Sequence, residues 1–326
     1  MYAAQPSGPL SLLARVRRLD AAAYERLEDE RHAVRIGAMR TSGYLVAVED
    51  ADLVRAATAR PAAAHAWRLR DAGIGDDEHR RLRAAVLAAA TEPRTTAELA
   101  AAAGTDRPLA PLLQTMAFAG ELVAVRPAGL RSNAARHVAT EAWLGRPFAD
   151  RPAAAALAWL AGRYLAAFGP ARVEDFRWWA GVPADAAAAA VAEVDTVDVG
   201  DGLRLPAGDL PAFDRLRRPR RATVDLLPKW DCWTMGYPRD GRRRFVDPDA
   251  QALMYDRDGN ALGVVLADGL AAATWGLRER RGRLDVDLAW LDRPGPALAS
   301  AARAAVDAAA AFLGFPGRVD VRETAG

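Results

Sequence analysis

Arginine side chains gather in three short segments of this 326-residue chain, and the chemistry that guanidinium groups do best is the binding of phosphate. The segments contain Arg215, Arg217, Arg218, Arg220 and Arg221; Arg242, Arg243 and Arg244; and Arg278, Arg280, Arg281 and Arg283. Such contacts to a nucleic-acid backbone give an affinity that does not depend on base sequence and that salt weakens. The first segment is the strongest candidate, because Pro219 favours an extended backbone and Asp214 is the only acid beside it. A solvated surface is the alternative for each segment, since the net charge is only +2.

A second group of reactive side chains lies at residues 228–231, where the only lysine, Lys229, stands two residues before Asp231. A lysine amine can form a Schiff base, but an ion pair with Asp231 is the interpretation that we favour. The Asp231 carboxylate has a catalytic interpretation, in which it orients a water or stabilises positive charge. It also has a structural one, in which it caps a turn after a strand at 223–227. We favour the structural interpretation, because single aspartates are common in such turns.

The composition argues against several other kinds of site. Cys232 is the only cysteine, so the chain forms no internal disulfide, and the four histidines lack the spacing of metal ligands. We expect no metal and no cofactor. No uncharged apolar run reaches the roughly 18 residues of a membrane helix, and Met1 opens no signal peptide. We therefore expect a cytoplasmic protein without a membrane contact.

Two stretches of the chain repeat one order of elements that must position these side chains. In each, an Ala-rich apolar run is followed by a short acidic segment, a glycine, an amphipathic run and two strands around a turn. The first copy comprises 82–90, 95–99, Gly104, 108–119, and strands at 122–125 and Leu130 around a turn at 127–129. The second comprises 154–168, 172–176, Gly181, 183–194, and strands at 197–199 and 203–205. Glu98 pairs with Glu174 at an offset of 76, and Gly104 pairs with Gly181 at an offset of 77.

Three helices and a hairpin are the order of a winged helix, a DNA-binding module. We predict an α+β fold of tandem winged-helix (helix-turn-helix) units followed by a small, mostly antiparallel β-domain. The predicted domains are an incomplete N-terminal winged-helix-like unit at 1–70, winged helices at 75–145 and 150–208, and a β-rich domain with one helix at 220–326. In the last domain, Asp-Gly and Gly-Asn turns separate strands expected at 223–227, 252–255, 262–266, 271–277, 284–291 and 318–323.

The amphipathic runs of the two copies offer few groups that read base edges. The first has Gln114 and Thr115, and the second is almost all alanine. We therefore expect loops and hairpins to touch DNA, with Arg131 and Arg136 making the first hairpin the more basic one. Trp178 and Trp179 together have the aromatic surface to stack on a base, but their helical spacing favours a place in the core.

Four short motifs occur in order along the chain: 39–46, 163–171 with 175–181, 226–231 with 235–239, and 259–275. Together they resemble the winged-helix DNA-binding proteins that include the bacterial crosslink-repair DNA glycosylases (AlkZ/YcaQ-like). The resemblance covers nearly the whole chain. It implies three winged helices around a central channel, with a C-terminal β-domain packed against them. It also implies double-stranded DNA, damaged DNA included, as the partner, and Arg40 of the first motif as a DNA contact.

The glycosylases of this family carry a Gln-x-Gln or Gln-x-Asp motif before a helix near the N-terminus. Gln5 matches the second position, whereas Ala3 stands where the first glutamine is expected, and Tyr44 stands where family members tend to have histidine. The resemblance implies that Gln5 positions a water, and a mobile terminus is the alternative. An amide oxygen holds a water but takes no proton, so this chemistry suits bases already activated by alkylation.

Three functions remain open from the sequence. The resemblance favours a monofunctional, monomeric, nucleoid-associated DNA glycosylase that unhooks crosslinked or alkylated bases, with its degenerate glutamine motif leaving excision itself undecided. The alternatives are a sequence-specific transcription regulator and a non-catalytic protein-interaction module. The poor set of base-reading groups argues against the regulator.

Overall fold

The chain divides into two compact units, each built from segments that are distant in sequence. The computed structural model describes residues 1–60, 66–125, 129–217, 222–281, 283–315 and 319–325. Unit 1 contains residues 1–24, 164–179 and 195–326, and unit 2 contains residues 25–163 and 180–194. Within the described residues, the longest helices are too short or too polar to cross a membrane.

Unit 2 holds a four-stranded sheet in the order β2-β1-β3-β4. The strands are β1 (Ala33–Gly37), β2 (Gly43–Ala47), β3 (Leu122–Val125) and β4 (Arg136–Ala139). β1 and β2 form an antiparallel hairpin, and β1 then pairs with β3 through Arg35 and Ala124. The N-terminal hairpin and the hairpin of the first repeat are therefore parts of one sheet.

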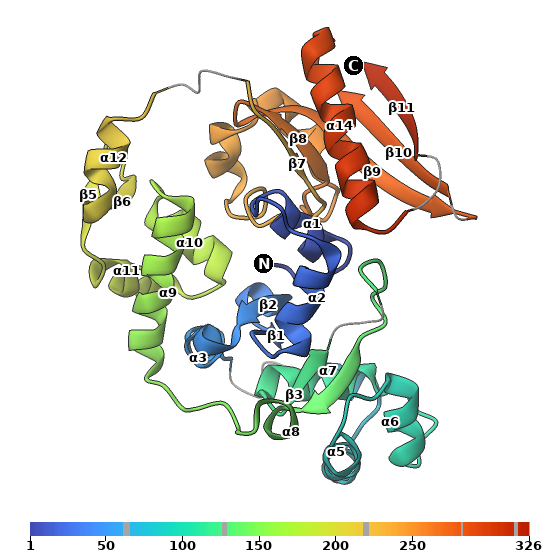
Figure 1. The fold of residues 1–326 in the computed structure, drawn as a ribbon. Helices are drawn as coiled ribbons and strands as arrows, with labels where there is room; N and C mark the ends of the chain where they lie inside the picture. Colours follow the sequence, from blue (N-terminus) through green and yellow to red (C-terminus); the bar gives the residue numbers. More distant parts are fainter. Residues whose placement is uncertain (61–65, 126–128, 218–221, 282, 316–318, 326) are drawn as a thin grey trace. The chain divides into compact units, whose positions relative to one another are not determined.

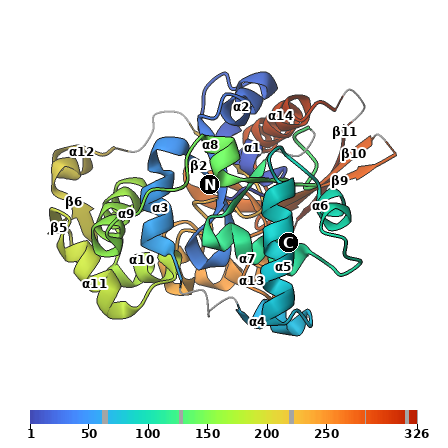
Figure 2. The same ribbon diagram turned by 90° about the horizontal axis from the view of Figure 1, so that it is seen from below.

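An aliphatic core holds several helices of unit 2 together. Within residues 51–144 the unit contains α3 (Ala51–Thr58), α4 (Ala66–Asp71), α5 (Asp76–Ala89), α6 (Thr96–Ala102), α7 (Ala110–Ala119) and α8 (Thr140–Leu144), and the helical residues of the core come from α4 to α7. Leu82, Leu99 and Leu112 are fully buried in the core that α5, α6 and α7 share, and Figure 2 shows α5 and α7 close together. Thr95 starts α6 with a capping box, in which its hydroxyl accepts from the Glu98 amide and the Glu98 carboxylate accepts from the Thr95 amide.

The second repeat has the same order of elements. It comprises α9 (Ala153–Phe168), α10 (Val173–Ala180), α11 (Ala184–Ala192) and the hairpin of β5 (Thr196–Asp198) and β6 (Arg204–Pro206). The Asp175 carboxylate accepts a 2.9 Å bond from the Arg172 amide, as Glu98 does from Thr95. The structural counterpart of Glu98 is thus Asp175 and not Glu174. A single offset of 77 now relates both this pair and Gly104 with Gly181, two glycines with positive φ.

Unit 1 contains the C-terminal sheet, in the order β11-β10-β9-β8-β7. Its strands are β7 (Val224–Leu227), β8 (Gly263–Ala267), β9 (Leu270–Arg280), β10 (Arg283–Trp290) and β11 (Val319–Ala325). All neighbours are antiparallel except β10 and β11. The helix α14 (Pro296–Phe312) contacts β7 and β11 and runs along this sheet in Figure 1. The α+β class and the mostly antiparallel sheet are confirmed.

Short helices also occur elsewhere in the described residues. α1 (Ser7–Leu13) and α2 (Ala21–Asp29) lie near the N-terminus, α12 (Leu210–Asp214) follows β6, and α13 (Gln251–Met254) precedes β8.

The predictions of two strands were wrong. Residues 252–255 fall mainly in α13, because Asp247 caps a helical turn that Pro248 begins. The return strand of the first hairpin is β4 at 136–139, not a strand at Leu130. Hydrogen bonds between the backbones of His137 and Arg94 fix β4 there.

Candidate functional site

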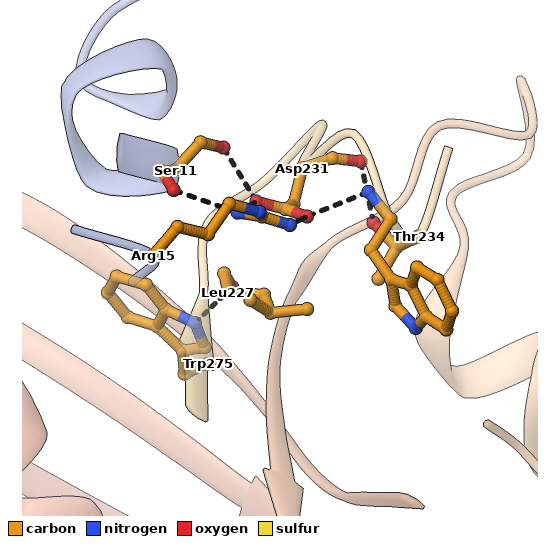
Figure 3. A network of polar contacts seen from close by, with 7 residues as sticks. Ser11, Arg15, Leu227, Asp231, Thr234 and Trp275 are labelled. Carbon is orange, nitrogen blue, oxygen red and sulfur yellow. Dashed lines mark hydrogen bonds and ion pairs between the residues drawn. The ribbon is translucent and has the colours of Figure 1, made fainter. Parts of the chain in front are cut away.

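A polar network joins α1 to the loop after β7 within unit 1; Asp231 and Ser11 are buried in it, whereas the Arg15 side chain is 36% exposed. Ser11 of α1 donates a 2.6 Å hydrogen bond to Oδ2 of Asp231. Arg15, two residues beyond the helix, donates from Nη1 to Oδ2 at 2.8 Å and from Nη2 to Oδ1 at 2.7 Å. The spacing of four residues places Ser11 and Arg15 on one side of the chain, where both reach the same carboxylate (Figure 3).

The Asp231 carboxylate is completely buried and uses all of its acceptor positions. Besides the three bonds from Ser11 and Arg15, Oδ1 accepts a 2.8 Å bond from the Trp233 amide. A carboxylate offers about four lone-pair positions, and four donors occupy them here. The structural interpretation of Asp231 agrees with this geometry, because no acceptor position is left for a water.

The loop that carries Asp231 is itself braced. The Asp231 amide donates to the Pro228 carbonyl at 3.1 Å, and the Asp231 carbonyl accepts from the Met235 amide at 2.9 Å and from the Thr234 hydroxyl at 3.1 Å. The Trp275 indole of β9 donates a 2.7 Å bond to the Leu227 carbonyl at the end of β7 (Figure 3). The network therefore rests on the rigid edge of the C-terminal sheet.

The electrostatics keep Arg15 charged and the neighbouring thiol neutral. Burial alone would lower the pKa of the Arg15 guanidinium, but the hydrogen bond with Asp231 and the charges of Asp231 and Asp225 raise it overall. Burial raises the pKa of the Cys232 thiol, so it stays protonated near neutral pH. Burial likewise raises the pKa of Asp225 on β7.

Gln5 lies immediately upstream of this network. It is 4% exposed and stands two residues before the first residue of α1, the helix that carries Ser11. The alternative of a mobile terminus therefore has little support, because the Gln5 side chain is packed inside unit 1. Its role in holding a water stays a prediction.

The candidate DNA contacts differ in their exposure. Arg131, Arg136, Arg215, Arg217 and Arg243 are exposed, and Arg40 is half-buried with a φ of 51° in the short helix Met39–Thr41. Arg218, Arg220 and Arg221 lie outside the described residues. The exposed members remain candidates for phosphate contacts.

Arg242 has a different environment from the one expected of a DNA contact. It is 8% exposed, and its guanidinium carbon lies 3.5 Å from the centre of the Tyr255 ring. Its Nε donates to the Tyr237 carbonyl at 3.3 Å. Burial raises the pKa of Tyr255 to about 12, so the stacked ring is a neutral phenol. Contact between Arg242 and a phosphate would require these interactions to break.

The third arginine segment is largely neutralised by acids on neighbouring strands. Arg278 pairs with Asp287 at 3.1 Å, Arg280 lies 4.0 Å from Asp285, and Arg283 pairs with Asp320. A cation that is already paired gives less free energy on meeting a phosphate, so this segment is a weaker candidate than its sequence indicates.

Lys229 and the two tryptophans also find partners within unit 1. The Lys229 amine lies 3.9 Å from Asp256, not at Asp231, and 4.5 Å from the centre of the Trp230 ring. Trp179 is 8% exposed and packs on Tyr164 at 5.0 Å between ring centroids, as expected for a core residue. Trp178 is only half-buried, and the guanidinium carbon of Arg242 lies 5.8 Å from the centre of its ring.

No motif in the sequence singles out Ser11 and Arg15, the two side-chain partners of Asp231. Their spacing of four residues is the only signal, and many pairs of residues share it. Across the described residues, no group of acids, histidines and cysteines has the arrangement of a metal site.

A known protein family and a solved structure are similar to this chain over nearly its whole length. The model of the family described as DNA glycosylase AlkZ-like matches residues 4–314. None of the curated proteins matches the chain. Among solved structures, the Streptomyces sahachiroi DNA glycosylase AlkZ has a TM-score of 0.74, covering 98% of this chain and 89% of its own at 16% identity. At that identity the likeness establishes a shared fold.

The family match spans both units, so it concerns the whole architecture and not one DNA-binding module. It supports a glycosylase-like function and does not favour the transcription regulator or the protein-interaction module. The chain belongs to the AlkZ-like family of DNA glycosylases.

Proposed function

We propose that this protein is a monomeric, monofunctional DNA glycosylase that excises alkylated or crosslinked bases from duplex DNA in the bacterial nucleoid. The observation that carries the proposal is the placement of Gln5. It matches the second position of the family's glutamine motif, and it is buried directly before α1 in a chain whose family match begins at residue 4.

Cleavage of an N-glycosidic bond by water can be assisted by one glutamine side chain. Cleavage of an N-glycosidic bond passes through a cation-like sugar, which a water then attacks. The Gln5 amide can orient that water through its carbonyl oxygen, but it cannot act as a base at neutral pH. An N-alkylated base is positively charged before cleavage, so it takes the bonding electrons and leaves as a neutral base without a proton from the protein. The water that adds to the sugar cation then loses its proton to solvent. The proposed substrates are therefore cationic, alkylated bases.

The other candidate groups fit a simple hydrolysis. Asp231 has no acceptor position left, so it is not assigned to the reaction. Lys229 is engaged with Asp256 and Trp230, which disfavours a Schiff-base step. No proton-transfer residue is required for a leaving group of this kind.

Duplex binding is assigned to the exposed arginines Arg131, Arg136, Arg215, Arg217 and Arg243. The helices α7 and α11 present little that reads bases. The Thr115 hydroxyl of α7 bonds back to the Pro111 carbonyl, and α11 is almost entirely alanine. The proposal is thus binding by backbone contacts, with selection by the lesion and not by sequence.

Excision with a matched pair of glutamine variants tests the proposal. Wild-type protein is incubated with a duplex that contains one N7-methylguanine, and abasic sites are revealed by alkaline cleavage. Q5A should reduce the rate at saturating protein by about a hundredfold, as for loss of one preorganised polar group. Q251A removes another buried glutamine of unit 1, 7% exposed, and should keep the wild-type rate. Equal rates for wild type and Q5A would remove Gln5 from the reaction.

A further inference from the structure

We infer that Asp231 is a positioning residue, which holds α1, and with it Gln5, on the edge of the C-terminal sheet. The inference rests on the proposed function of Gln5. It assigns Asp231 to the alignment of the reacting segment and not to contact with DNA.

The first argument is where the donors come from. Three of the four hydrogen bonds to the Asp231 carboxylate come from Ser11 and Arg15, and the fourth comes from its own loop. Arg15 also donates from Nη1 to the Ser11 carbonyl at 2.8 Å, so one guanidinium joins the end of α1 to Asp231. A carboxylate placed to act on a substrate would keep an acceptor free, whereas this one is fully used in holding a helix.

The second argument is the length of α1. The helix has only seven residues, and so short a helix is not stable by its own hydrogen bonds. Its position must come from packing and from side chains such as Ser11 and Arg15. Gln5 stands six residues before Ser11, so a rotation or shift of α1 is transmitted to the amide of Gln5.

The third argument is the rigidity of the anchor. The Asp231 loop is fixed at its start by the bond from Trp275 to Leu227 and internally by the Pro228, Met235 and Thr234 bonds. A fully satisfied network centred on a buried carboxylate, as here at Asp231, favours one arrangement. Because excision needs the water-holding group within fractions of an ångström, loss of the anchor should slow the reaction more than it weakens DNA binding.

The experiment compares D231N with D287N in full-length protein. Asp287 also pairs with an arginine in unit 1, but its side chain is 44% exposed. For each variant we would measure hydrogen exchange of the amides from Leu10 to Leu13 in α1, the affinity for duplex DNA, and the single-turnover excision rate on N7-methylguanine duplex at saturating protein.

D231N should speed exchange in α1 at least tenfold and slow excision at least tenfold, with duplex affinity unchanged within twofold. D287N should match wild type in all three. S11A, a milder change, should shift exchange and rate in the same direction. The double variant S11A/D231N should be no worse than D231N alone, because both changes break one network.

Several results would overturn the inference. These are wild-type exchange in α1 of D231N, additive effects of S11A and D231N, or a loss of affinity equal to the loss of rate. If D231N does not fold, the inference is tested with S11A alone, through hydrogen exchange in α1 and the excision rate of that variant. A wild type that excises nothing would defeat the proposed function, whereas the exchange measurements would still decide whether Asp231 holds α1.

Discussion

The two repeats use one local scheme in two different environments. An offset of 77 relates Thr95 to Arg172, Glu98 to Asp175, Leu99 to Phe176 and Gly104 to Gly181. In both, the acid at the third helical position accepts from the amide three residues before it. Leu99 and Phe176 are both fully buried. The repeat is therefore present in the structure as well as in the amino-acid sequence.

The pKa values of the two acids are shifted in opposite directions. Glu98 is exposed, and the hydrogen bonds from Thr95 hold its pKa below the usual range. Asp175 is 2% exposed, and burial raises its pKa although Arg172 and Arg244 oppose the rise. The hairpins differ too, since the first carries exposed Arg136 whereas the second turns through Asp198 and Asp201. The first copy thus presents exposed arginines on its hairpin, whereas the second has a buried acid at its helix cap and an acidic hairpin turn.

The largest expected contrast is in the cores of the repeats. F176A should destabilise the protein by about 4 kcal/mol and L99A by about 3 kcal/mol, because each leaves a cavity at a fully buried site. Urea unfolding gives the size of each effect. Hydrogen exchange should place the loss in unit 1 for F176A and in unit 2 for L99A, since Phe176 and Leu99 belong to different compact units. Loss of protection in the same segments for both variants would refute this division.

The next contrast is between the hairpins as DNA contacts. The double variant R131Q/R136Q should weaken duplex binding about tenfold near 0.1 M salt and lower the slope of log affinity against log salt by about two. D198N/D201N in the second hairpin should leave that slope unchanged. Anisotropy titrations at several salt concentrations measure both. Equal slopes for the arginine variant and wild type would exclude the first hairpin from the interface.

A smaller contrast concerns the helix caps. T95A removes the hydroxyl of a complete capping box and should cost about 1 kcal/mol. R172A changes the matching position, where only the backbone amide takes part and the 3.6 Å pair with Asp240 is exposed, so its effect should stay within about 0.5 kcal/mol. Thermal unfolding of both variants makes the comparison. An effect of R172A as large as that of T95A would show a capping role for its side chain.

The smallest contrast is a pair of opposite pH dependences. Because the folded pKa of Glu98 is lowered, its contribution to stability is present above the unfolded pKa and is lost as the pH falls through the folded value. The stability difference between wild type and E98Q should therefore shrink on acidification. Asp175 has a raised folded pKa, so wild type should gain stability relative to D175N as the pH falls through it. Unfolding between pH 3 and pH 7 tests both signs, and two slopes of the same sign would contradict the assignment.

Much of the fold could be predicted because its signals are local. Helical runs with a glycine after them, and Asp-Gly turns between apolar strands, gave the repeats and most of the C-terminal sheet. One error came where a non-local contact decides, since Arg94 fixes the position of β4. The other came from a local signal read as a strand: Asp247 caps the helical turn at 248–250 that leads into the helix at 251–254.

The candidate site was less predictable, because a sequence motif does not show which of its side chains are buried. Arg242 and Arg243 are neighbours in sequence, yet one stacks on Tyr255 and the other is exposed. Ser11 and Arg15 lie more than 200 residues from Asp231, so only the fold brings them together. Gln5 was reached through a family resemblance, and its burial was not foreseeable from its place near the terminus.

Release of a free base tests the central claim most directly. Wild-type protein at a concentration that binds all of an N7-methylguanine duplex is incubated, and the small-molecule fraction is analysed by mass spectrometry. We predict free 7-methylguanine in amounts equal to the abasic sites formed, with Q5A releasing about a hundredfold less per unit time. A fully bound duplex that stays intact and releases no base would contradict the account.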